Sequence, residues 1–175
     1  MRFTRVFVAA ALAASVLAAR PAAASDQVIF LVRHAEKAAT PAAPPATKTM
    51  MADDPPLSAA GQARAAKLAA LLASADVRHI FTTEFLRTRQ TAAPLAGKLN
   101  LKPVMSASKD PDPLVEQVRR IKGNVLIVGH SNTVPDLLKR LGIKDDITIV
   151  DPEYDNLFVV VRPDAGEPTL IRLRY

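Results

Sequence analysis

The sequence predicts an α/β fold: a three-layer sandwich with a mainly parallel sheet and helices on both of its faces. Short apolar runs rich in β-branched residues alternate with segments of helical periodicity, which is the pattern of strands joined by crossover helices. The chain ends differently, because residues 169–175 alternate apolar and basic side chains after a turn-prone segment. With residues 156–162 they predict a C-terminal antiparallel hairpin. The other predicted strands are residues 28–32, 79–83, 103–105 and 125–128.

The predicted helices each place apolar side chains on one face, as helices that cover a sheet do. The clearest span residues 58–73 and 133–141. A third follows Leu86, and we expect Pro94 to break or kink it because proline lacks a backbone donor. A short fourth helix carries the apolar residues Leu114, Val118 and Ile121.

Residues 1–24 have the features of a secretory signal peptide. Two arginines precede an apolar run over residues 6–14, and small residues at positions 22 and 24 form a cleavage pattern. The run is shorter than the ~20 residues of a membrane span, so a retained anchor is the weaker alternative. We therefore expect an exported protein, periplasmic or secreted, whose single domain comprises residues 25–175 and keeps no stable membrane anchor after cleavage.

Composition argues against several classes of protein. The chain has no cysteine, so it has neither a disulfide framework nor a lipoprotein attachment site. Its formal charge of +6 falls to +3 when the three arginines of residues 1–24 are removed. It has no Trp and only two Tyr, which leaves no stacking platform for bases. We expect no nucleic-acid partner, and we expect a monomer.

Two of the three histidines directly follow predicted strands. His34 comes after residues 28–32, beside Arg33, and His130 comes after residues 125–128. Because the carboxyl ends of parallel strands meet at one edge of a sheet, these side chains should lie together. Arg87 should join them at the start of the helix after a third strand. Guanidinium groups bind phosphoryl oxygens well, so the edge is a predicted phosphate site. The third histidine, His79, precedes a strand and is expected to be structural.

Four ordered blocks carry a specific resemblance: residues 31–36 (LVRHAE), 57–61 (LSAAG), 86–91 (LRTRQT) and 128–132 (VGHSN). In order and spacing they resemble the histidine phosphatase superfamily, in its phosphoglycerate-mutase-like branch. Ala35 stands where many members of that family have glycine. The resemblance covers nearly all of residues 25–175.

The resemblance implies a metal-independent phosphatase that acts on phosphate monoesters and needs no cofactor. By the family pattern, His34 attacks phosphorus and becomes phosphohistidine before water releases phosphate. Arg33, Arg87 and His130 bind the non-bridging oxygens and stabilise the transition state. The expected partner is thus a small phosphorylated substrate, and cell-envelope sugar phosphates are one class suggested by analogy with exported relatives. The loops above the site, which set specificity, contain no motif that identifies a substrate.

The resemblance also implies a carboxylic acid that protonates the leaving oxygen, and the sequence does not identify it. Asp110 and Asp112 lie in the expected stretch before the second histidine, while Glu36 and Glu84 lie near the same sheet edge. Turn and helix-cap chemistry next to proline is the favoured explanation for either aspartate taken singly. Asp112 is our preferred candidate.

Other functions remain alternatives. A serine hydrolase is disfavoured because Thr133 stands where the nucleophile elbow needs glycine and no histidine follows His130. A zinc site would have to form beside two guanidinium groups. A non-catalytic phosphate-binding module remains possible while the acid is unidentified. A phosphomutase is disfavoured because the stretch between Arg87 and His130 is short.

Overall fold

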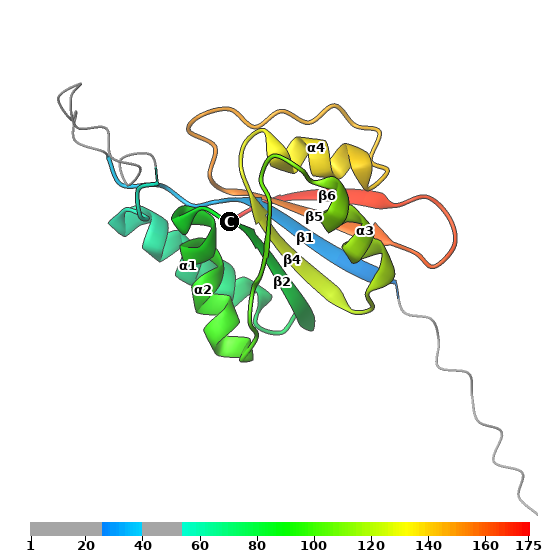
Figure 1. The fold of residues 1–175 in the computed structure, drawn as a ribbon, viewed down its shortest axis with the longest axis horizontal. Coiled ribbons are helices and arrows are strands. Elements are labelled where there is room, and N and C mark those ends of the chain that lie inside the picture. Colours follow the sequence, from blue (N-terminus) through cyan, green and yellow to red (C-terminus); the bar gives the residue numbers. More distant parts are fainter. Residues whose placement is uncertain (1–25, 40–53) are drawn as a thin grey trace, which may run out of the picture.

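The computed structural model describes residues 26–39 and 54–175, which form one six-stranded sheet and four helices (Figure 1). In chain order the elements are β1 (Gln27–Arg33), α1 (Ala59–Leu72), β2 (Val77–Thr83), α2 (Leu86–Leu99), β3 (Val104–Ser106), α3 (Asp112–Arg120), β4 (Asn124–Gly129), α4 (Thr133–Arg140), β5 (Asn156–Arg162) and β6 (Thr169–Arg174). Every predicted strand is present within a few residues of its expected bounds.

The sheet has the strand order β3-β2-β4-β1-β5-β6. Strands β3, β2, β4 and β1 are parallel neighbours, and β5 runs antiparallel to β1. Strand β6 pairs antiparallel with β5, which confirms the predicted C-terminal hairpin. In the register of β1 and β4, Arg33 lies opposite Gly129, so the residues that follow both strands emerge at the same edge.

Both faces of the sheet are covered by helices (Figure 1). Alternate residues of β1 point to opposite faces, and both sets are buried. Phe30 and Val32 share a core with helices α1 and α2, whereas Ile29 and Leu31 share the other core with α3 and α4. Burial on both faces explains why the central strands are continuous apolar runs. The predicted three-layer α/β sandwich is confirmed.

Of the break or kink expected at Pro94, the break is wrong, because α2 runs without interruption from Leu86 to Leu99. Pro94 lies on the exposed side of the helix, where the carbonyl freed by the missing donor can be hydrated. Its neighbours Leu95 and Ala96 are buried against the sheet and hold the helix in place. Tertiary packing therefore outweighs the local preference.

The predicted signal peptide lies outside the described residues, as do residues 40–53. Among the helices that the structure describes, none is both long and apolar enough to cross a membrane. At the open edge of the sheet, the side chains of Ile171 and Leu173 on β6 are about half exposed, as expected for a half-covered hairpin.

Candidate active site

Three neighbouring strands bring the predicted site residues together at the carboxyl edge of the sheet. His34 follows β1 and His130 follows β4, and the backbone N–H of His34 donates to the carbonyl of Gly129 at 2.9 Å. The two imidazole rings lie with their centroids 5.3 Å apart. Strand β2 ends beside them and leads into α2, whose first turn carries Arg87.

His34 is held as a neutral imidazole with one free lone pair. Its ring is buried, and Nδ1 lies 2.8 Å from the carbonyl oxygen of Ala35. Because a carbonyl can only accept, Nδ1 carries the proton and Nε2 is unprotonated. The pKa of His34 is lowered to about 4, mainly by burial and also by the nearby His130 and arginines, which together outweigh the Ala35 hydrogen bond. At neutral pH the Nε2 lone pair is thus available for bonding.

His130 is buried as well and is anchored by two threonines. Its Nε2 lies 3.0 Å from the hydroxyl of Thr83, which lies 3.0 Å from the hydroxyl of Thr88. Burial lowers the pKa of His130 to about 4, helped by the charge of Arg87. A hydroxyl can either donate or accept, so either tautomer of neutral His130 keeps this buried hydrogen bond.

Arg87 is oriented by contacts with its own helix and with the segment before α1. Its guanidinium lies 4.2 Å from the centroid of the Phe85 ring, 3.4 Å from Asp54 and 3.5 Å from Nδ1 of His130. The Asp54 carboxylate also accepts from the backbone N–H of Leu86, which caps the start of α2. Sequence reasoning missed Asp54, because its loop has no periodicity that would locate it.

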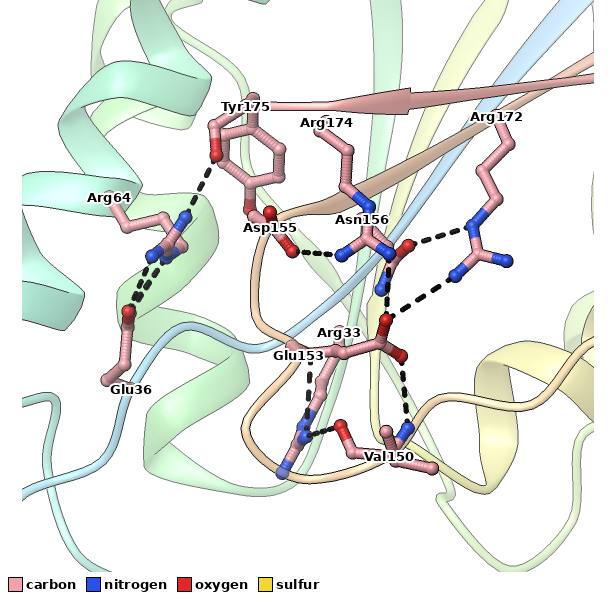
Figure 2. A network of polar contacts seen from close by, with 10 residues as sticks. All are labelled: Arg33, Glu36, Arg64, Val150, Glu153, Asp155, Asn156, Arg172, Arg174 and Tyr175. Atoms are coloured by element: carbon pink, nitrogen blue, oxygen red, sulfur yellow. Dashed lines mark hydrogen bonds and ion pairs between the residues drawn. The ribbon is translucent and has the colours of Figure 1, made fainter.

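Arg33 is buried at the end of β1 and is enclosed by residues 150–155. Its Nη1 lies 3.5 Å from the carbonyl oxygen of Val150 and 3.4 Å from that of Glu153 (Figure 2). Its Nη2 pairs with Asp151, and its guanidinium lies 4.1 Å from the centroid of the Tyr154 ring. These partners were not predicted, since nothing in the sequence links this loop to β1.

The four predicted residues His34, Arg33, Arg87 and His130 line one open pocket. Lys37 and Lys109 stand at its rim, and Tyr154 forms part of its wall. Such a group of permanent cations and neutral imidazoles suits a phosphoryl group, whose oxygens need several donors. Within the described residues, no group of three or more His, Cys, Asp or Glu side chains could hold a metal ion.

A model of the histidine phosphatase superfamily (branch 1) matches residues 29–108, which include His34, Arg33 and Arg87. Over these residues the chain matches the histidine phosphatase superfamily. A comparison with curated proteins gave no significant match.

Solved structures of histidine phosphatases share the fold. The SixA protein of Agrobacterium tumefaciens is 24% identical with a TM-score of 0.62, and the match covers 85% of this chain and 98% of that one. The protein histidine phosphatase SixA complexed with tungstate is 17% identical, with a TM-score of 0.64 and coverage of 84% and 96%. A mycobacterial glucosyl-3-phosphoglycerate phosphatase is 12% identical, with a TM-score of 0.60 and coverage of 85% and 97%.

None of the four acid candidates lines the pocket. Glu36 points to α1, where it forms a bidentate pair with Arg64 that holds the pKa of Glu36 below its usual range (Figure 2). Glu84 accepts from the backbone and the hydroxyl of Ser108. Asp112 lies in the first turn of α3.

Asp112, our preferred candidate, pairs with Arg140 and is not among the residues that line the pocket. Asp110 is exposed next to it. The carboxylates that do line the pocket are Asp136 and Asp151, and both are in ion pairs. Arg33 holds the pKa of Asp151 below its usual range, so that group is ionised at neutral pH. Among the described residues, both carboxylates that line the pocket are therefore held in ion pairs.

Proposed function

We propose that the protein is a metal-independent phosphatase that hydrolyses phosphate monoesters through a phosphohistidine on His34. The observation that carries the proposal is the hydrogen bond from Nδ1 of His34 to the Ala35 carbonyl, 2.8 Å long. It leaves the lone pair of Nε2 free beside two arginines and a second imidazole, which is the requirement for nucleophilic attack by histidine.

In the first step, Nε2 of His34 attacks phosphorus, an N–P bond forms and the P–O bond to the leaving group breaks. Arg33, Arg87 and His130 bind the non-bridging oxygens and stabilise the charge of the transition state. In the second step, water attacks the phosphohistidine, the N–P bond breaks and phosphate leaves. The leaving oxide takes up a proton from solvent and the attacking water gives one up, so ester and water become alcohol and phosphate, and His34 returns to its neutral state.

The ion pairing of the carboxylates that line the pocket favours a second candidate for the substrate. A poor leaving group such as a sugar oxide needs a positioned acid, and the described part of the pocket offers only ion-paired carboxylates. A phosphoramidate such as phosphohistidine has a nitrogen leaving group that can take its proton from solvent. One structural neighbour is named a protein histidine phosphatase, whereas another is named a glucosyl-3-phosphoglycerate phosphatase. Phosphohistidine on a partner protein is therefore the second candidate.

Turnover of three substrates by the purified protein tests both candidates. Nitrophenyl phosphate, a sugar phosphate and a phosphohistidine peptide would be compared at equal concentration, with released phosphate as the readout. Sugar-phosphate turnover comparable with that of the aryl ester supports a monoesterase with an acid, and turnover of the other two alone supports the second candidate. Phosphate binding without any release would indicate the non-catalytic module, and transfer within the substrate would indicate a mutase.

Export is the remaining part of the proposal. A small phosphorylated compound of the cell envelope would be accessible to a periplasmic or secreted enzyme. N-terminal sequencing of the mature protein should find Ser25 or a residue within a few positions of it. An intact Met1 on exported protein would instead support a retained anchor.

A further inference from the structure

We infer that Glu153, on the loop between α4 and β5, is a positioning residue that holds Arg33 in place and links the C-terminal strand β6 to the active site. The inference rests on the proposed function, in which Arg33 binds the phosphoryl group. Glu153 does not line the pocket, so it would act through Arg33 and not on the substrate.

Arg33 depends on this loop for its orientation. The guanidinium is buried, its Nε has no hydrogen-bond partner in the described structure, and its Nη1 donates to the carbonyls of Val150 and Glu153. The Tyr154 ring packs on it from the same loop. The Asp151 carboxylate also pairs with it but is 79% exposed, and is therefore a weakly held partner. A shift of the loop would therefore move the guanidinium.

Glu153 closes the turn that presents these carbonyls. Its backbone N–H donates to the carbonyl of Val150 at 2.7 Å, and its carboxylate accepts from the backbone N–H of Val150 at 3.2 Å. Both ends of the turn are thus tied by one residue, and the two carbonyls that receive Arg33 are the first and last of that turn. Loss of the carboxylate removes one of the two ties.

The same carboxylate fixes the turn to β6 (Figure 2). It lies 2.7 Å from Nη2 of Arg174 and 3.8 Å from Nη2 of Arg172. The hydrogen bond from Arg174, followed by that from Val150, holds the pKa of Glu153 below its usual range, so the group stays ionised. Arg174 also pairs with Asp155, and Arg172 donates to Asn156 at 2.9 Å.

Glu153 is therefore the point where two sets of contacts meet. Its carbonyl touches Arg33, and its side chain touches two arginines of the last strand. Strand β6 lies at the open edge of the sheet, two strands away from the pocket-forming end of β1. The network gives this edge strand a role in the geometry of the site.

The test is a double-mutant cycle between Glu153→Gln and Arg33→Ala, with Glu167→Gln as the matched control. Glu167 forms an equally short pair with Lys144, at 2.6 Å, but on the exposed surface. In the protein with Arg33, we expect Glu153→Gln to lower kcat/KM on the order of 10-fold for every substrate that turns over. The control should stay within twofold of the unmodified protein. In the Arg33→Ala background, Glu153→Gln should cause no further loss.

Binding of inorganic phosphate, measured by calorimetry in the same cycle, separates this inference from the proposed function. If the protein has no turnover, the proposed function fails, yet phosphate affinity should still fall with Glu153→Gln only when Arg33 is present. Equal losses in both backgrounds, or no loss with Arg33 present, would overturn the inference. If Glu153→Gln does not fold, Arg174→Gln applies the same cycle from the β6 side, with the same expected dependence on Arg33.

Discussion

The rings of His34 and His130 lie 5.3 Å apart at the carboxyl edge of the sheet, and both are buried there with no carboxylate partner among residues 26–39 and 54–175. Catalytic histidines are often paired with a carboxylate, which raises their basicity. Here a carbonyl orients one ring and a threonine hydroxyl the other, and both rings are kept neutral by burial next to two arginines.

The pH profile of turnover should reflect these neutral imidazoles. Attack requires unprotonated His34, whose pKa is lowered to about 4. We therefore expect kcat/KM to fall only as the pH drops toward 4, with no loss near pH 6.5 that is due to a group of the enzyme. The phosphate group of the substrate itself ionises near a pH of about 6, so its contribution to the profile has to be subtracted. Profiles for two substrates of different phosphate pKa check this. An essential group that titrates near 6.5 with both would contradict it.

Stability should depend on pH for the same reason. A histidine with a lowered folded pKa is protonated first in the unfolded chain, so the free energy of unfolding falls as pH drops from 6.5 toward 4 and no further below that. Between pH 7.5 and 4.5 the unmodified protein should lose about 2 kcal/mol more than His130→Gln. Urea unfolding at the two pH values measures this, and equal losses in the two proteins would refute it.

The predicted acid is tested by the choice of leaving group. Because no free carboxylate lines the described pocket, each of Asp110→Asn, Asp112→Asn, Glu36→Gln and Glu84→Gln should slow sugar-phosphate and nitrophenyl-phosphate hydrolysis equally or not at all. Arg87→Ala should slow both strongly, because the phosphoryl group is common to both. A loss of ~10²–10⁴ confined to the sugar phosphate would identify that carboxylate as the acid.

Gly61 supports the segment that follows His34. A Cβ at this position would lie 2.1 Å from the carbonyl oxygen of Glu36, which accepts from the backbone N–H of Ser58. Gly61→Ala should therefore destabilise the fold by about 2 kcal/mol and lower turnover, since residues 35–37 must shift. A Cβ added at Gly97 in α2 would meet nothing within 4 Å. Gly97→Ala should stabilise by about 0.5–1 kcal/mol in the same urea titrations. Destabilisation by both to the same extent would argue against this contact.

The periodicity of apolar residues is enough to predict the strands and helices of this molecule. The buried strands follow from the apolar runs. The parallel pairing of these strands places His34, Arg87 and His130 at one edge of the sheet. Pro94 misleads, since its local effect is outweighed by the burial of Leu95 and Ala96.

The contacts that orient the site are of another kind. Asp54 and residues 150–155 lie in loops without periodicity, far along the chain from the arginines they touch. Whether a loop carbonyl or carboxylate reaches an arginine depends on the conformation of the loop in the folded protein, which local sequence patterns do not determine. Similarly, Glu36 follows His34 closely in sequence, but its side chain extends to Arg64 on α1, away from the pocket. Sequence proximity to a nucleophile is therefore a poor guide to an acid.

The most direct test of the account is the identity of the phosphorylated residue in enzyme quenched during turnover. The free Nε2 lone pair predicts an acid-labile, base-stable phosphate on His34, located by peptide mass mapping. His34→Ala should lack both the label and turnover while it keeps the unfolding transition of the unmodified protein. Label on another residue, or undiminished turnover of His34→Ala, would contradict the phosphohistidine mechanism.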